Sequence, residues 1–146
     1  MGETTSILTE AEYVLDDQVG YLLRLASQRH AVIFQKHSID HLTPTQFTTL
    51  LRVSENSEVS QNHLGRLAAM DVATTKGVVD RLKAKGLMQS RPDRNDKRRS
   101  VISLTLSGMA LIDDLRKIGH VITDNTLSPL TAQERQTLVN LLRKII

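Results

Sequence analysis

The sequence of 146 residues contains no cysteine and no tryptophan, and only 3% of its residues are aromatic. Without cysteine, the chain has no disulfide framework, no thiolate zinc site, no iron–sulfur cluster and no cysteine-based redox switch. Leucine, isoleucine, valine and alanine must therefore fill the core. The hydrophobic content of 40% and the charged content of 24% are ordinary for a globular protein, so disorder throughout is excluded.

Long apolar runs are missing too: none approaches the roughly 18 residues that a membrane span needs. The first ten residues, Met1 to Glu10, are polar and lack the basic start and apolar core of a signal peptide. We therefore expect a protein that is not exported and that works in the cytoplasm. The sequence also lacks a glycine-rich phosphate loop, an HExxH motif and a recognisable nucleophile elbow. We expect neither an enzyme nor a bound cofactor.

Charge is unevenly spread along a chain whose length fits one compact domain. The formal net charge is +3. Between Ser60 and Ser100, however, ten lysine and arginine residues stand against four acids, so this segment carries +6 and the remainder −3. Such asymmetry is typical of a surface that binds a polyanion, although a solvated basic face would give the same pattern.

The N-terminal part of the chain predicts two helices. Apolar residues recur at three- and four-residue steps from Glu10 to about Ser38 without a proline, which indicates one long helix. Its apolar surface is wide, so part of it is expected to pack on a second copy of the chain. Thr43-Pro44-Thr45-Gln46 then combines a hydroxyl N-cap, a proline at the first helical position and a capping-box glutamine. A helix from Pro44 to Val53 follows from it.

Two further helices are predicted close together. Ser60 can cap a short helix from Gln61 to Ala68, and Asp71 can cap a longer one from Val72 to Lys85. Gly86 ends the longer helix, because glycine adopts the left-handed conformation at little cost. Two helices joined by so short a turn form a helix-turn-helix candidate.

Beyond these helices the apolar period changes from about 3.6 to 2. Residues 87–91 and 100–104 are predicted strands, and the polar turn between them, residues 92–99, carries four cations. Together they predict a β-hairpin with a basic tip. Helical patterns return from residue 105 to about 127 and, after a second capping box at residues 131–134, continue to the C-terminus.

This order of elements resembles the winged-helix regulators of the MarR family. Residues 93–105, DRNDKRRSVISLT, resemble the family's wing signature: an aspartate, a second aspartate three residues on, two basic residues, a strand and Leu-Thr. Residues 79–87, VDRLKAKGL, resemble the end of the recognition helix with its closing glycine. Residues 104–108, LTLSG, resemble the start of the long fifth helix. The resemblance covers roughly residues 14–146.

The resemblance implies a homodimeric bacterial transcription regulator. The fold class implied is mostly α with a small β-hairpin wing, a winged helix-turn-helix between N- and C-terminal dimerisation helices. We expect residues 1–146 to form a single domain. Within it, residues 10–42 and 106–146 would form the dimerisation helices, and residues 43–105 the DNA-binding lobe. The alternative is that the apolar helices merely pack within one chain.

DNA binding needs a helix that fits the major groove, short polar side chains at its leading end, and cations along the phosphates. The candidate DNA contacts are Ser60, Gln61, His63, Thr74, Thr75, Lys76, Arg94, Lys97 and Arg98. Arg94 lies nearest the hairpin tip, where an arginine suits a narrow minor groove. Asp96 and Arg98 are expected to form an ion pair that stiffens the turn. A capping role for Ser60 and a solubilising role for the hairpin cations remain the alternatives.

Sensing is predicted for the first helix. Arg24, His30 and Phe34 resemble the positions at which aromatic-acid-responsive members of the family bind their ligand. Arginine offers a charged fork to a carboxylate, and histidine a switchable donor to a ring substituent. The expected function is a ligand-responsive regulator, a repressor released from a pseudo-palindromic operator by a small aromatic carboxylic acid. A surface arginine and a structural histidine are the alternative.

Two other functions stay open. His30, His37 and His41 share a helical stripe, which would suit a zinc-responsive repressor, although only Asp40 lies near enough in sequence to complete a ligand set. The winged helix would also suit an architectural or adaptor protein that contacts protein instead of DNA.

Overall fold

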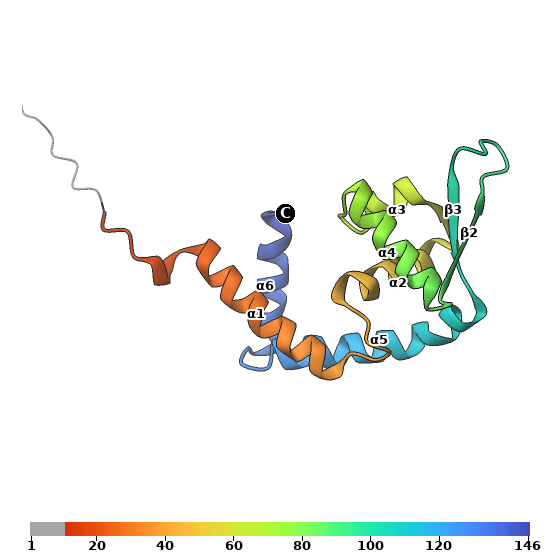
Figure 1. The fold of residues 1–146 in the computed structure, drawn as a ribbon. Coiled ribbons are helices and arrows are strands. Elements are labelled where there is room, and N and C mark those ends of the chain that lie inside the picture. Colours follow the sequence, from red (N-terminus) through yellow and green to blue (C-terminus); the bar gives the residue numbers. More distant parts are fainter. Residues whose placement is uncertain (1–10) are drawn as a thin grey trace, which may run out of the picture.

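The computed structural model describes residues 11–146, so the prediction for Met1 to Glu10 lies outside the described residues. The predicted fold class is confirmed: the chain is mostly helical with a small antiparallel sheet (Figure 1). The elements in chain order are a 3-10 turn η1 (Leu15–Asp17), α1 (Val19–His37), α2 (Pro44–Asn56), β1 (Glu58–Ser60), α3 (Gln61–Leu67), α4 (Val72–Ala84), β2 (Met88–Pro92), β3 (Ser100–Leu104), α5 (Leu106–Thr126) and α6 (Ala132–Lys144).

Both predicted capping boxes are present. At the start of α2, the Thr43 hydroxyl accepts a hydrogen bond from the Gln46 amide, and the Gln46 side chain accepts one from the Thr43 amide, each at 3.2 Å. Thr131 and Glu134 make the same reciprocal pair at the start of α6. Gly86 has a φ of 74°, the left-handed conformation predicted for the residue that ends α4.

The predicted ends of the first two helices need correction. α1 begins at Val19, not near Glu10, and Gln18 before it is extended, with φ −87° and ψ 132°. Every residue from 11 to 17 is exposed, so the chain supplies no core on which a longer helix would pack. α2 runs to Asn56, beyond the predicted end at Val53. The Asn56 side chain donates from Nδ2 to the Arg52 carbonyl at 2.7 Å, which satisfies a carbonyl group at the end of the helix.

The sheet has three strands in the order β1-β3-β2, all antiparallel. β2 and β3 form the predicted hairpin. β1 was not predicted, because Val59 is the sole apolar residue in its polar surroundings. In the structure Val59 pairs with Ile102 of β3 and is 6% exposed. The short strand therefore covers the free edge of β3 near the start of α3.

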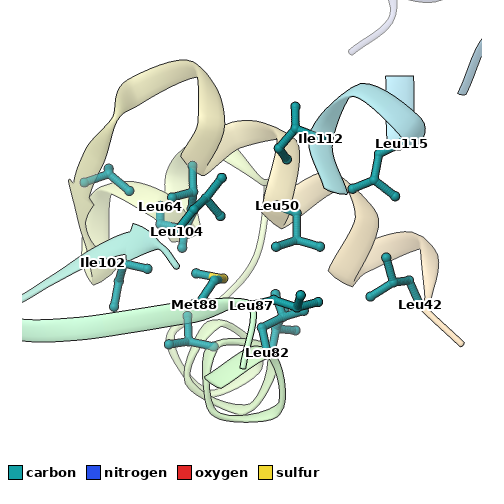
Figure 2. Packing of buried hydrophobic residues seen from close by; sticks show 14 residues of the cluster. Leu42, Leu50, Leu64, Leu82, Leu87, Met88, Ile102, Leu104, Ile112 and Leu115 are labelled. Atoms are coloured by element: carbon teal, nitrogen blue, oxygen red, sulfur yellow. The ribbon is translucent and has the colours of Figure 1, made fainter. Parts of the chain in front are cut away.

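The core lies in the part of the chain between residues 42 and 115. Figure 2 shows Leu50 of α2, Leu64 of α3, Leu82 of α4 and Ile102 of β3 converging, and all four are fully buried. Ile112 and Leu115 extend this cluster from α5. Helix α5 thus anchors the core at its N-terminal half and runs away from it at its C-terminal half (Figure 1).

Helix α1 lies along the C-terminal half of α5, and α6 turns away from the end of α5 (Figure 1). Two residues of α1 hold this contact. Arg29 donates to the carbonyls of Thr126 and Asn125 at the C-terminal end of α5, and His30 Nδ1 lies 2.8 Å from Thr126 Oγ1. Within residues 11–146, no helix has the length and apolar character that crossing a membrane requires.

Candidate nucleic-acid interface

Helices α3 and α4 form the predicted helix-turn-helix, and local hydrogen bonds hold their N-termini. The Ser60 hydroxyl accepts from the His63 amide at 3.2 Å, so Ser60 caps α3. Asp71 Oδ1 accepts from the Thr74 amide at 2.7 Å and caps α4. This amide holds the pKa of Asp71 below its ordinary value of 3.8, because it stabilises the ionised carboxylate.

Thr75 is one predicted DNA contact that the structure contradicts. Its side chain is 2% exposed, and its hydroxyl donates to the Asp71 carbonyl at 2.7 Å. Gly65 of α3 approaches so closely that a Cβ there would lie 2.7 Å from Thr75 Oγ1. Thr75 therefore packs α4 against α3. The signal was in the sequence, because Thr75, Val78, Val79 and Leu82 recur at helical spacing on one buried face.

The solvent-facing side of α4 carries the other predicted contacts. Thr74 and Lys76 are exposed, as are Val72 and Ala73 before them. Lys76 Nζ lies 2.9 Å from Asp80 Oδ2 one turn further along. Through this hydrogen bond, the pKa of Asp80 is lowered and the pKa of Lys76 is raised.

The hairpin turn contains the predicted ion pair. Asp96 accepts two bonds from the Arg98 guanidinium, at 3.0 Å to Nε and 3.2 Å to Nη2, and a third at 3.1 Å from the Arg98 amide. These bonds lower the pKa of Asp96, the guanidinium contributing most. Arg94 and Lys97 are exposed and make no ion pair within residues 11–146. The hairpin projects from the rest of the molecule (Figure 1).

Two surface hollows bring the predicted residues together. A hollow of about 390 Å³ opens between α3 and the start of α4, and Gln61, Arg66 and Val72 help to line it. A smaller one of about 130 Å³ lies where α3 meets the base of the hairpin. Its lining residues are Ser60, Gln61, Asn62, Arg98, Arg99 and Ser100. Asn62 and Arg99 were not predicted as site residues, although each adjoins a predicted residue in sequence.

A separate cleft of about 480 Å³ lies at the junction of α1 and α2. Its lining residues are Ala31, Phe34, Gln35, Ser38, Asp40, His41, Leu42, Thr43 and Pro44. Phe34 contributes a benzene ring to this lining; it is 5% exposed and meets the Phe47 ring edge-on with centroids 5.5 Å apart. An aromatic wall beside hydrogen-bonding groups is suited to a small planar ligand.

The three predicted ligand-binding residues are not brought together within one chain. Phe34 lines the cleft at the α1–α2 junction, whereas Arg24 and His30 do not. Arg24 is exposed, and its guanidinium carbon lies 5.9 Å from the centroid of the Tyr21 ring. His30 contacts Thr126 of α5 instead. Sequence spacing placed all three on one helix but could not place them around one cavity.

The linker after α1 connects this cleft to α4. Asp40 and His41 have φ values of 53° and 54°, an uncommon conformation for residues other than glycine. Lys85 at the end of α4 donates from Nζ to the Asp40 carbonyl at 2.8 Å. The cleft lining and the second helix of the helix-turn-helix therefore share a direct hydrogen bond.

The predicted histidine stripe forms no cluster of three candidate metal ligands among the described residues. No group of three His, Asp or Glu side chains between residues 11 and 146 lies close enough together to hold a metal ion. His30, the first member of the predicted histidine stripe, is held by Thr126.

Known proteins match both the sequence and the fold. The MarR family model matches residues 42–100. The transcriptional repressor NicR of Pseudomonas putida is 41% identical over 95% of this chain and 89% of its own length. A Pseudomonas aeruginosa protein of known crystal structure is 44% identical, with a TM-score of 0.88 over 91% of this chain and all of its own.

A third relative is BpsR of Bordetella bronchiseptica, whose structure concerns the regulation of its DNA binding by 6-hydroxynicotinic acid. It is 37% identical to this chain, with a TM-score of 0.88 over 92% of this chain and 97% of its own. With a helix-turn-helix, a basic hairpin and identities of this size over nearly the whole length, the chain belongs to the MarR family of winged helix-turn-helix transcriptional regulators.

Proposed function

We propose that this protein is a repressor that binds a pseudo-palindromic operator as a homodimer and leaves it when a small aromatic carboxylic acid binds. The observation that carries the proposal is the near full-length similarity to BpsR, whose DNA binding 6-hydroxynicotinic acid regulates. The similarity to NicR, itself a repressor, supports the sign of the regulation.

The proposed DNA surface is the exposed basic side of residues 43–105. Thr74 and Lys76 at the leading end of α4 would face base edges in the major groove. Ser60, Gln61 and His63 at the start of α3 would face phosphates, and Arg94, Lys97 and Arg98 would bring the hairpin to the neighbouring backbone and minor groove. The charge of +6 between Ser60 and Ser100 supports this arrangement.

The proposed dimer surface is formed by helices α1, α5 and α6 within residues 10–42 and 106–146. These helices expose large apolar side chains, among them Val19, Leu22, Leu23, Val121, Leu141 and Ile145. Leu141 is 53% exposed and Val19 is 65% exposed in the single chain. A second copy would cover these side chains, because exposed large apolar residues gathered on a few helices are typical of protein–protein interfaces.

The proposed effector site adjoins the cleft at the α1–α2 junction. The ring of the acid would pack near Phe34 of one copy, and its carboxylate would pair with Arg24 of the other, because ten residues of α1, about 15 Å, separate the two positions within one chain. Because Arg24 stands among the exposed apolar residues of α1, the proposal places it at the interface between two copies. A permanent cation in a partly dry interface is favourable only when an anion offsets its desolvation. His30 would respond to the ring substituent.

The test starts from an operator selected from a random duplex pool by the purified full-length protein. Fluorescence anisotropy then measures operator affinity with 6-hydroxynicotinic acid, 4-hydroxybenzoic acid or benzoic acid, and with nicotinamide as a control without a carboxylate. At least one acid should weaken binding about tenfold or more, and nicotinamide should not. Arg24→Ala should remove the response while leaving operator affinity intact, and His30→Ala should reduce it. Operator affinity that no aromatic carboxylate changes would overturn the proposal.

A further inference from the structure

Val72 is an unusual residue for its position. It is the first residue of α4 and is 75% exposed. Within residues 43–105, all of which the structure describes, it is the one large apolar side chain that is exposed. The remaining large apolar residues of this region are buried or half-buried.

The chain's own folding does not use the Val72 side chain. Valine has a lower helix propensity than alanine, and at an exposed first turn it gains no packing that offsets this difference. The start of α4 is held instead by Asp71, which caps the helix, and by Thr75, which packs on Gly65. A group outside the chain is therefore the natural contact for the Val72 isopropyl group.

The surroundings of Val72 identify that group. Val72 and Lys76 are four residues apart on α4 and share one helix face, and Val72 lines the same hollow as Gln61 and Arg66. A single apolar side chain among polar and basic ones is too small for a protein interface. It matches the major groove, whose one apolar group is the C5 methyl of thymine.

The geometry of the neighbours strengthens this assignment. Lys76 Nζ lies 2.9 Å from Asp80, one turn further along α4, so the lysine side chain extends away from Val72 and does not cover it. Ala73 and Thr74 are short. The isopropyl group of Val72 is also rigid, because a β-branched side chain has essentially one χ1 rotamer in a helix, and it loses little entropy on contact.

We propose that Val72 is a specificity-determining residue that contacts a thymine methyl group in each operator half-site and so selects a T·A pair at that position. This inference rests on the proposed function, in which α4 enters the major groove. It adds to that function a chemical rule for one base pair.

The test uses an operator selected from a random duplex pool by the full-length protein. Each thymine is replaced in turn by deoxyuridine, which removes the C5 methyl and keeps the base pair. For the wild type, one position in each half-site should lose about fourfold in affinity, the effect of one lost apolar group. Val72→Ala should bind the thymine operator and the deoxyuridine operator with equal affinity. Val72→Thr, which has the same shape and one methyl fewer, should show an intermediate ratio. Thr48→Ala, at an exposed position on α2 that is not among the proposed DNA contacts, is the control and should keep the wild-type ratio.

The outcomes separate the inference from the function on which it rests. Suppose the wild type distinguishes operator from random duplex, and Val72→Ala still loses affinity on deoxyuridine substitution as much as the wild type does. That result would overturn the role of Val72 alone. A wild type that binds no duplex selectively would overturn the proposed function as well. Circular dichroism checks that each variant is folded. If Val72→Ala is not folded, Val72→Thr is compared with the wild type instead.

Discussion

The proposed DNA-binding lobe, residues 43–105, and the terminal helices α1 and α6, called the arms below, differ in what stabilises them. Leu50, Val53, Leu64 and Leu82 of the lobe are fully buried by other residues of the same chain. Helix α1 buries Phe34 among its 19 residues, and α6 has no buried residue. The core of residues 42–115 is thus complete within one chain, whereas the apolar faces of the terminal helices stay exposed in the part of the chain that the structure describes. In the proposed dimer, the second copy would cover the apolar faces of α1 and α6, whereas the lobe would need no such cover.

Charge separates the same two regions. The basic excess of +6 lies between Ser60 and Ser100, and the rest of the chain carries −3. DNA would therefore attract the lobe and not the arms. In the proposed function, the arms would pair with a second copy and hold the effector.

The largest effect should come from the core of the lobe. Leu50→Ala removes a fully buried side chain between α2 and its neighbours, so the free energy of unfolding should fall by about 2–5 kcal/mol. Urea denaturation followed by circular dichroism measures it. Leu141→Ala on α6 is the matched control, since Leu141 is 53% exposed. If Leu50→Ala and Leu141→Ala lose equal free energy of unfolding at a dilution that separates the copies, the proposed difference between lobe and arms is contradicted.

A second substitution should disrupt pairing of the arms and leave the fold of the lobe intact. Leu141→Arg puts a charge into the apolar face of α6, and sedimentation should show a mass near 16.3 kDa in place of twice that value. Operator affinity should drop about 100-fold, because the two half-sites are then bound independently. Asn140→Arg on the same helix adds the same charge at a polar position and should leave the dimer intact. A Leu141→Arg protein that remains dimeric would refute the proposed surface.

Sequence patterns predicted the lobe better than the arms, and the reason is physical. Capping boxes, a helix-ending glycine and a change of apolar period are local signals. The Thr43–Gln46 box and Gly86 therefore placed their elements correctly. β1 was missed because its pairing with β3 is non-local and Val59 alone carries it. The prediction that Thr75 contacts DNA is wrong because its hydroxyl group is polar but its position lies on the buried face of the helix.

The candidate site shows the same limit. The Asp96–Arg98 ion pair was predictable from two residues in one turn. The cleft at the α1–α2 junction was not, because its walls depend on the left-handed linker at Asp40 and His41. Helical spacing also left open what His30 contacts, and the answer, Thr126, is 96 residues away.

A smaller effect is expected at the bond between the cleft and the lobe. Lys85→Met removes the hydrogen bond to the Asp40 carbonyl, so effector binding should pass less of its energy to α4. The ratio of operator affinities without and with effector should fall about two- to fivefold. Lys83→Met is the matched control. It removes the same charge from the same end of α4, but the hydrogen bond that it removes runs to Ser90 and not to Asp40. An unchanged ratio in Lys85→Met would show that the linker bond does not couple the two regions.

The smallest effect concerns acid stability of the lobe. The pKa of Asp71 is lowered on folding, so its ionised form contributes stability above its ordinary value of 3.8, and this stability is lost as the pH falls through the lowered value. Asp71→Asn keeps a capping oxygen without the charge. Its melting temperature should lie slightly below that of the wild type at pH 7, and the gap should close below pH 4. Asp114→Asn, at an exposed position on α5, is the control. A difference in melting temperature between Asp71→Asn and the wild type that persists in acid would contradict the role of the Asp71 charge.

Native mass spectrometry of the complex with a selected operator tests the proposed dimer, its DNA binding and its response to an aromatic acid together. Without effector, we expect a complex of two chains and one duplex. With 6-hydroxynicotinic acid or another hydroxylated aromatic carboxylate, we expect free duplex and a dimer that carries the acid. A single chain on the duplex, or a complex that persists while the acid is bound, would contradict the proposed function.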